Sequence, residues 1–156
     1  MIKDIDQLLN SGLCMRWHSN PDMVELSDNL AEHQWNVAMI VMFLEPNFTK
    51  RLLVEALTHD VGELVAGDLS YDFKINNPEI AALHKVAEDE AKNKIIQNDA
   101  LTAKEVDVLK QADWISSYLH VARSNPALLT RHDWEDQYNH FYKEFTMSGI
   151  LIKSIR

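Results

Sequence analysis

Apolar residues recur at steps of three and four positions along almost the whole chain, and this spacing constrains the fold more than any other feature. Such a period places apolar side chains on one face of a helix. The four prolines fall between the periodic segments, and alternating apolar and polar runs, as in strands, are lacking. The sequence therefore predicts an all-α protein.

We expect about six helices in one domain over residues 1–156, because a chain of this length can bury enough surface to form its own core. Asn29 with Glu32, and Thr102 with Glu105, are candidate capping boxes. The expected helices cover about 4–10, 27–44, 49–66, 78–97 and 102–124, and the last begins near 133. Segments 14–26 and 68–77 are predicted to be loops.

The same spacing assigns side chains to the core. The helices expected to bury an apolar face include the first, with Ile5, Leu8 and Leu9, and the fourth, with Ile80, Leu83, Ala87, Ala91 and Ile95. The last helix has an aromatic face of Trp134, Tyr138, Phe141, Tyr142 and Phe145. Those rings could pack internally or against another subunit.

The charge balance excludes one class of partner. The formal net charge is −9, whereas a surface that grips a nucleic-acid polymer needs Lys and Arg to neutralise phosphates. The single Cys14 cannot form an internal disulfide, the start of the chain lacks a signal-peptide pattern, and apolar runs stay far below the roughly 20 residues that span a bilayer. We therefore expect a cytoplasmic protein with no membrane partner.

Four residues with metal-binding side chains interrupt the apolar faces of three predicted helices: His33, His59, Asp60 and Asp113. One buried His is more often a hydrogen-bonded core residue than a ligand, but a buried Asp is costly unless it is paired or binds a metal. Four such groups on three helices indicate that they converge. Two imidazoles and two carboxylates suit one divalent transition metal, such as Co, Mn, Fe or Zn.

Glu63 lies one helical turn after His59 and is the candidate general acid/base. A metal held by Asp60 and its neighbours would polarise a phosphorus centre and lower the pKa of a bound water. The pattern thus predicts a metal-dependent phosphohydrolase with Asp60 and Glu63 as catalytic residues.

The order of these residues and their neighbours resembles the HD-domain phosphohydrolases, and within them the bacterial 5′-deoxynucleotidases of the YfbR type. Five segments between about residues 8 and 125 carry the likeness: Arg16-Trp17, Ala31-Glu32-His33, Thr58 to Glu63, Ala66 to Leu69, and Lys110 to Asp113. The resemblance implies an HD fold, a deoxyribonucleotide substrate, a homo-oligomer, a metal held by the four His and Asp residues, and Glu63 as acid/base.

The resemblance also implies roles in substrate binding. Arg16 would hold the substrate phosphate, because its guanidinium fork suits phosphate oxygens. Trp17 would pack on the sugar and disfavour a 2′-hydroxyl. Asp68 would accept a hydrogen bond from the 3′-hydroxyl, and Lys74 would meet phosphate.

The chain departs from the family at Ser70-Tyr71-Asp72-Phe73, where the relatives commonly have a proline. It resembles in size the compact phage members, some of which cleave triphosphate from dATP. The leading hypothesis is hydrolysis of deoxynucleoside monophosphates, and the alternative is a dNTP (dATP) triphosphohydrolase, with Lys74, Lys85 and Arg123 as candidates for the additional phosphates. A nucleotide-binding module without catalysis and a helical interaction protein are further hypotheses.

Overall fold

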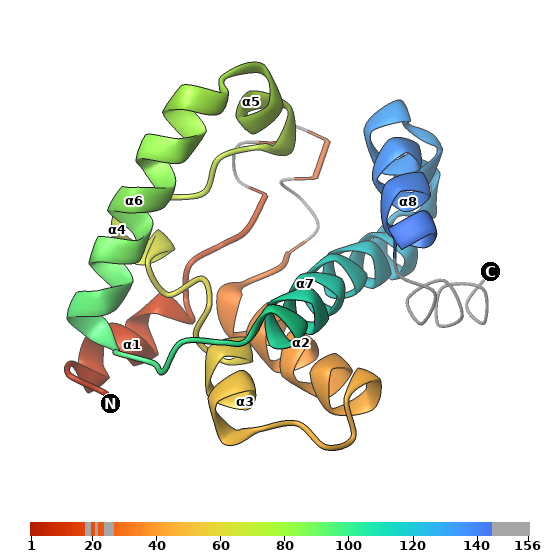
Figure 1. Ribbon diagram of the computed structural model, residues 1–156. Coiled ribbons are helices and arrows are strands. Elements are labelled where there is room, and N and C mark those ends of the chain that lie inside the picture. The colour runs from red at the N-terminus through yellow and green to blue at the C-terminus, as the bar shows by residue number, and fades with distance from the viewer. Residues whose placement is uncertain (18–19, 21, 24–26, 145–156) are drawn as a thin grey trace.

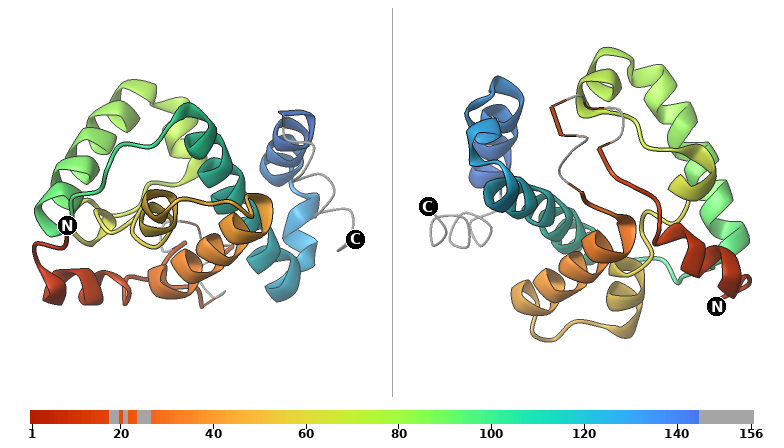
Figure 2. Two further views of the ribbon diagram at one scale, coloured as in Figure 1. Left: turned by 60° about the horizontal axis from the view of Figure 1, so that its bottom comes forward. Right: turned by 180° about the vertical axis from the view of Figure 1, so that it is seen from behind.

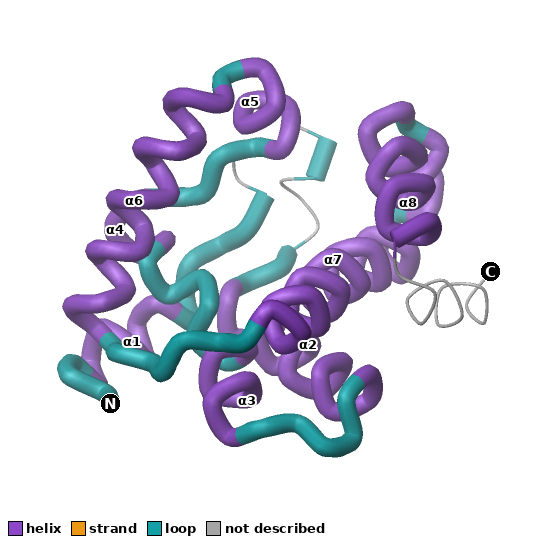
Figure 3. The backbone as a smooth tube through the Cα atoms, viewed as in Figure 1, coloured by secondary structure: helices purple, strands orange, loops and turns teal. Residues whose placement is uncertain are grey.

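Two long helices, α2 (Leu30–Leu44) and α7 (Ala103–Ser124), pack along each other at the centre of the fold (Figure 1). They belong to a computed structural model that describes residues 1–17, 20, 22–23 and 27–144. Within these ranges the chain forms helices, loops and two isolated bridges (Figure 3). The all-α prediction is confirmed.

The remaining described helices surround this pair: α1 (Ile5–Ser11), α3 (Lys50–Ala56), α4 (Glu63–Ala66), α5 (Tyr71–Asn76), α6 (Pro78–Ile95), the 3-10 helix η2 (Pro126–Thr130) and α8 (His132–Glu144). α6 contacts α1, α4 and α5 on one side of the molecule, whereas η2 and α8 follow the end of α7 on the other side (Figures 1 and 2). None of the helices described is long and apolar enough to cross a membrane.

Local capping explains where the two central helices begin. The capping box at α7 is confirmed, because the Thr102 side chain accepts the Glu105 N–H at 3.3 Å and the Glu105 carboxylate accepts the Thr102 N–H at 2.8 Å. At α2 the Asn29 side chain accepts the Glu32 N–H at 3.0 Å. The helix therefore begins at Leu30, three residues later than expected.

Apolar packing on both sides of α7 forms the core. One buried group contains Met23, Trp114, Ile115, Tyr118, Leu119, Val121 and Trp134. The other contains Val37, Ala38, Val41, Leu52, Ala56, Val108 and Ala112. Because both groups include residues of α7, this helix is fixed on two sides, and its polar residues are held in defined positions.

The helix predicted over 49–66 is wrong in its middle. α3 ends at Ala56, α4 begins at Glu63, and the residues between them form turns with three-residue hydrogen bonds, such as Val61 N–H to the Thr58 carbonyl. At the end of these turns Gly62 packs so closely against α6 that a Cβ would approach the Glu88 carbonyl oxygen to 2.2 Å. His59 and Asp60 therefore lie on a turn between two short helices.

Two further expectations differ from the structure. The segment 68–77 contains α5, which Ser70 caps by accepting the Phe73 N–H at 3.3 Å. Several side chains that were expected to be buried are exposed, by 53% for Ile5, 67% for Leu9, 50% for Ile80 and 72% for Leu83. α1 and α6 pack on each other and on α4, and leave these residues outside.

Candidate active site

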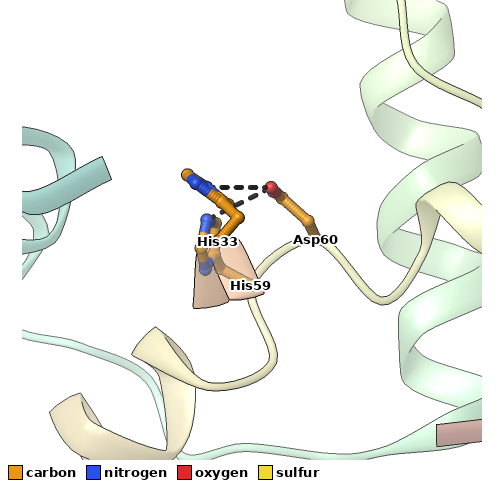
Figure 4. A group of neighbouring side chains, drawn as sticks. All are labelled: His33, His59 and Asp60. Atoms are coloured by element: carbon orange, nitrogen blue, oxygen red, sulfur yellow. Dashed lines mark ion pairs between the residues drawn. The ribbon is translucent and has the colours of Figure 1, made fainter. Parts of the chain in front are cut away.

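Three of the predicted metal-binding residues converge between α2 and the turn that precedes α4. One ligand atom from each of His33, His59 and Asp60 lies within 4.8 Å of the others. The Asp60 Oδ2 atom is 3.6 Å from His33 Nε2 and 3.2 Å from His59 Nε2 (Figure 4). The packing of α2 beside this turn brings together residues more than twenty positions apart in sequence.

The fourth residue, Asp113, comes from α7. Its Oδ1 atom is 3.0 Å from His33 Nε2 and 3.9 Å from His59 Nε2. The side chain of Asp113 is 44% exposed, whereas that of His33 is 1% exposed. We call His33, His59, Asp60 and Asp113 the His/Asp cluster.

The other ring nitrogen of each histidine is also bonded. His59 Nδ1 is 3.0 Å from the Ala56 carbonyl oxygen, and His33 Nδ1 is 3.1 Å from the Ser116 hydroxyl. Because a carbonyl only accepts, Nδ1 of His59 carries a proton, so that Nε2 presents a lone pair to the cluster whenever the ring is neutral, as it would be when bound to a metal. Nε2 of both rings is buried without a hydrogen-bond partner. Such a donor set fits a divalent transition metal.

The charges of the cluster shift one another's ionisation. Burial opposes the charged form of His59, but the Asp60 and Asp113 carboxylates outweigh it and raise the pKa of this imidazole well above its usual value. Burial likewise opposes ionisation of Asp60, yet His59 lowers the pKa of this carboxyl to about 2. Burial and the nearby Arg16 lower the pKa of His33. The carboxylates are thus charged at neutral pH and attract a cation.

Glu63 is the first residue of α4, directly after the turn that carries His59 and Asp60. Burial and the negative charges of Asp60 and Asp68 raise the pKa of Glu63 to about 9. In the metal-free protein the carboxyl therefore holds a proton at neutral pH. A shifted carboxyl beside a charged site is typical of a general acid/base.

A cavity of about 300 Å³ opens beside the cluster. Its lining includes Asp113 and all four residues that were predicted to bind substrate: Arg16, Trp17, Asp68 and Lys74. We call this cavity the Arg16 pocket. The structure thus brings the predicted substrate residues to one cavity that the cluster borders.

Arg16 and Trp17 are held tightly on one wall of the pocket. Arg16 is 11% exposed and donates from Nη2 to the Ser117 hydroxyl at 3.2 Å. The Arg16 Cζ atom lies 4.6 Å from the centre of the Trp17 ring, within the range of a cation–π contact. Trp17 has a φ of 63°, a left-handed conformation that non-glycine residues rarely adopt.

Asp68 and Lys74 also line the pocket, from the segment between α4 and α6. Asp68 follows Gly67, whose φ of 75° ends α4 in a conformation that suits glycine. α5 carries Lys74, and its Nζ atom is 3.6 Å from Asp68 Oδ1. Of the other basic residues considered for extra phosphates, Lys85 pairs with Glu88 and Asp89, and Arg123 lines a separate cavity between α2 and α7.

Sequence reasoning missed several residues of this site. Lys110 of α7 lines the Arg16 pocket one turn before Asp113, and α8 contributes Asp133, Trp134 and Gln137. The periodicity of α8 gave no sign of this role, because it identifies an apolar face but not the surface that the face meets. Of the aromatic face of α8, Trp134 is buried in the core, whereas Phe145 lies outside the described residues.

Known proteins resemble this chain over most of its length. A family model described as 5′-deoxynucleotidase YfbR-like matches residues 12–145. The chain is 26% identical over 151 residues to 5′-deoxynucleotidase YfbR of Photorhabdus temperata, covering 72% of this chain and 77% of the relative. It is 27% identical over 158 positions to 5′-deoxynucleotidase plu3092 of Photorhabdus laumondii, covering 76% and 79%.

A third relative, 5′-deoxynucleotidase VV1113 of Vibrio vulnificus, is 30% identical over 117 residues and 60% of each chain. No solved structure matches the chain. The family model includes every residue of the His/Asp cluster and of the Arg16 pocket. The chain belongs to the 5′-deoxynucleotidase YfbR-like family.

Proposed function

We propose that the protein is a metal-dependent 5′-deoxynucleotidase that converts a deoxynucleoside monophosphate and water into a deoxynucleoside and orthophosphate. The observation that carries this proposal is the His/Asp cluster at the edge of a cavity lined by Arg16 and Trp17. The names of the relatives, 5′-deoxynucleotidases, support the same reaction. The reaction breaks the P–O5′ bond and transfers a water oxygen to phosphorus.

The four residues of the His/Asp cluster would hold one divalent transition metal, with Co, Mn, Fe and Zn as candidates. When bound, the metal would polarise the phosphoryl group and make a coordinated water more acidic. The Nε2 atoms of His33 and His59, which are buried beside the two carboxylates and make no hydrogen bond, support this assignment. Asp60 would contribute its charged carboxylate, whose low pKa keeps it available as a ligand.

The side chains around the cluster would perform the remaining tasks. Arg16, which lines the pocket, would bind phosphate oxygens through its guanidinium fork. Glu63 would move the proton between the attacking water and the departing O5′ atom, consistent with its raised pKa. Trp17 would pack on the sugar and leave no room for a 2′-hydroxyl, which selects deoxyribose. Asp68 would accept a hydrogen bond from the 3′-hydroxyl.

Product analysis tests this reaction against the alternative. Purified protein with Mn²⁺ or Co²⁺ is incubated with deoxynucleoside monophosphates, ribonucleoside monophosphates and deoxynucleoside triphosphates. We expect orthophosphate from the deoxynucleoside monophosphates, slower release from the ribonucleotides, and no turnover by a folded Glu63→Gln variant. Release of triphosphate from dNTPs alone would establish the triphosphatase instead. Nucleotide binding without any turnover would establish the binding module.

We also propose that the chain forms a homo-oligomer through apolar side chains that α1 and α6 leave exposed. Leu83 is 72% exposed, Leu9 67% and Val86 56%. A second copy would remove this apolar surface from water. Light scattering on the wild type and on Leu83→Glu should show a smaller species for the variant, with unchanged unfolding temperature at low concentration. A wild type that is monomeric at micromolar concentration would refute this part.

A further inference from the structure

A buried carboxylate that the sequence did not single out lies behind the Arg16 pocket. Asp28, just before α2, is 2% exposed. Its Oδ2 atom accepts hydrogen bonds from Arg16 Nη1 at 2.8 Å and from the Trp17 indole Nε1 at 3.1 Å. The Asp28 backbone carbonyl also accepts the Arg16 N–H at 2.9 Å. One residue therefore holds both the guanidinium and the indole that line the pocket.

Burying the Asp28 carboxylate costs free energy that a residue with only a packing role would not need to spend. A buried carboxylate loses its hydration and is tolerated when charged hydrogen bonds replace it. Trp17 is in addition held at a φ of 63°, a strained conformation that persists where the surroundings impose it. The charged hydrogen bonds and the strained backbone thus lie at two adjacent residues, Arg16 and Trp17, which line a cavity. Strained backbone conformations are concentrated at binding and active sites.

Without Asp28, other carboxylates would compete for Arg16. Burial opposes the charge of the guanidinium, but Asp28, and after it Asp113 and Asp60, outweigh burial and raise the pKa of Arg16. A guanidinium released from Asp28 would turn toward the His/Asp cluster. On the far side of Asp28, His120 Nδ1 lies 4.0 Å from Oδ1, beyond hydrogen-bond distance. Among the described residues, Asp28 therefore provides the charged hydrogen bond that holds Arg16, and Ser117 provides a neutral one.

We propose that Asp28 is a positioning residue for nucleotide binding, which orients Arg16 toward the phosphate and Trp17 toward the sugar through one carboxylate. The inference rests on the proposed function, in which Arg16 and Trp17 contact a deoxynucleotide. It predicts that phosphate affinity and the preference for deoxyribose are linked, although different side chains provide them. A change at Asp28 lowers both.

The test measures dissociation constants for dAMP and AMP by calorimetry in the Mn²⁺-loaded Glu63→Gln protein, which binds without turnover. Asp28→Asn, added to this background, keeps the shape of the side chain but removes its charge. We expect dAMP affinity to fall about tenfold, as for the loss of one charged hydrogen bond. The ratio of AMP to dAMP dissociation constants should fall at least threefold, toward one.

Two further variants separate positioning from loss of stability. Glu105→Gln removes another buried carboxylate that pairs with an arginine, Arg51, far from the pocket, and it should lower the unfolding temperature without changing the ratio. Trp17→Phe retains an aromatic ring but lacks the indole donor. Asp28→Asn should change the ratio much less in the Trp17→Phe background than in the parent.

The outcomes distinguish the inference from the function on which it rests. A parent protein that binds no nucleotide refutes both. A parent that prefers dAMP, with an Asp28→Asn variant whose affinity and ratio stay within twofold, refutes the inference alone. Tighter binding by Asp28→Asn, or weaker binding with an unchanged ratio, also overturns it, because the carboxylate would then act through its charge or on Arg16 only.

Discussion

Each histidine of the His/Asp cluster is oriented by a bond to its second ring nitrogen. Ser116 contacts His33, and the neighbouring Ser117 contacts Arg16, so adjacent residues of α7 support the two halves of the site. Groups that orient a metal ligand commonly change metal affinity by about 10- to 100-fold when they are removed. These two serines therefore offer a matched comparison.

We predict that Ser116→Ala lowers Mn²⁺ affinity about tenfold, because the His33 ring loses the hydroxyl that orients it. Ser117→Ala should leave metal affinity unchanged and weaken dAMP binding instead. Both constants can be measured by calorimetric titration after treatment with a chelator. Equal metal affinity in the wild type and Ser116→Ala would show that the hydroxyl does not orient the ligand.

The raised pKa of Glu63 predicts how stability depends on pH in the metal-free protein. Between its unfolded pKa near 4.5 and its folded pKa of about 9, the folded state keeps the Glu63 proton and the unfolded chain releases it. The contribution of this group to the free energy of unfolding is largest below pH 4.5. It decreases as pH rises and is lost once pH passes about 9. Glu63→Gln, which cannot ionise, should lack this contribution.

Thermal unfolding with a chelator at pH 5 to 9.5 measures the effect. The unfolding temperature of the wild type should decrease more steeply with rising pH than that of Glu63→Gln. Parallel curves for the two proteins would mean that burial does not hold the Glu63 proton.

At the scale of elements, the turn between α3 and α4 decides where His59 and Asp60 lie. Thr58 closes this turn by donating to the Val54 carbonyl at 2.7 Å, and Asn98 donates to the Thr58 hydroxyl at 2.9 Å. Gly62, two residues after Asp60, is buried against the backbone of α6. The geometry of the cluster therefore depends on a close approach that other residues would prevent.

We predict that Gly62→Ala destabilises the fold by about 1–3 kcal/mol, because its Cβ would overlap the Glu88 carbonyl oxygen and force backbone shifts. Metal affinity should fall with it, since Asp60 would move. Gly67→Ala is the control: its Cβ meets open space, and its backbone (φ 75°, ψ 174°), a region that is essentially limited to glycine, costs about 1–3 kcal/mol without disturbing the turn. Denaturant unfolding and metal titration check both variants, and retention of metal affinity in Gly62→Ala would contradict this account.

The elements that sequence predicts best are those fixed by local chemistry. Thr102 and Glu105 lie three positions apart and cap α7 as expected. The break at residues 57–62 was not predictable from the sequence, because the apolar period continues through Val61 and Leu64. The contact of this turn with α6 forms only in the folded protein. Asp28 was missed for the same reason, since its partner Arg16 is twelve positions away and meets it through packing.

At the scale of the whole molecule, the residue types of the site were predictable, but its assembly was not. His33, His59, Asp60 and Asp113 stood out as polar residues in apolar segments, and the structure brings all four together. The sequence did not predict that α8 lines the pocket or that α1 and α6 leave apolar side chains exposed. Both features depend on how whole helices pack against one another. The net charge of −9 repels a nucleic-acid polymer, which would contact a large part of the surface. A small anion needs only the basic residues of the pocket, Arg16, Lys74 and Lys110.

The central claim is that the His/Asp cluster holds one metal ion that drives hydrolysis in the Arg16 pocket. The most direct measurement is phosphate release from dAMP while Mn²⁺ or Co²⁺ is titrated into chelator-treated protein. We predict no release without metal, saturation at about one ion per chain, and at least a hundredfold loss in His59→Gln and Asp113→Asn variants that remain folded. Undiminished release in the presence of chelator, or full activity in both variants, would contradict the account.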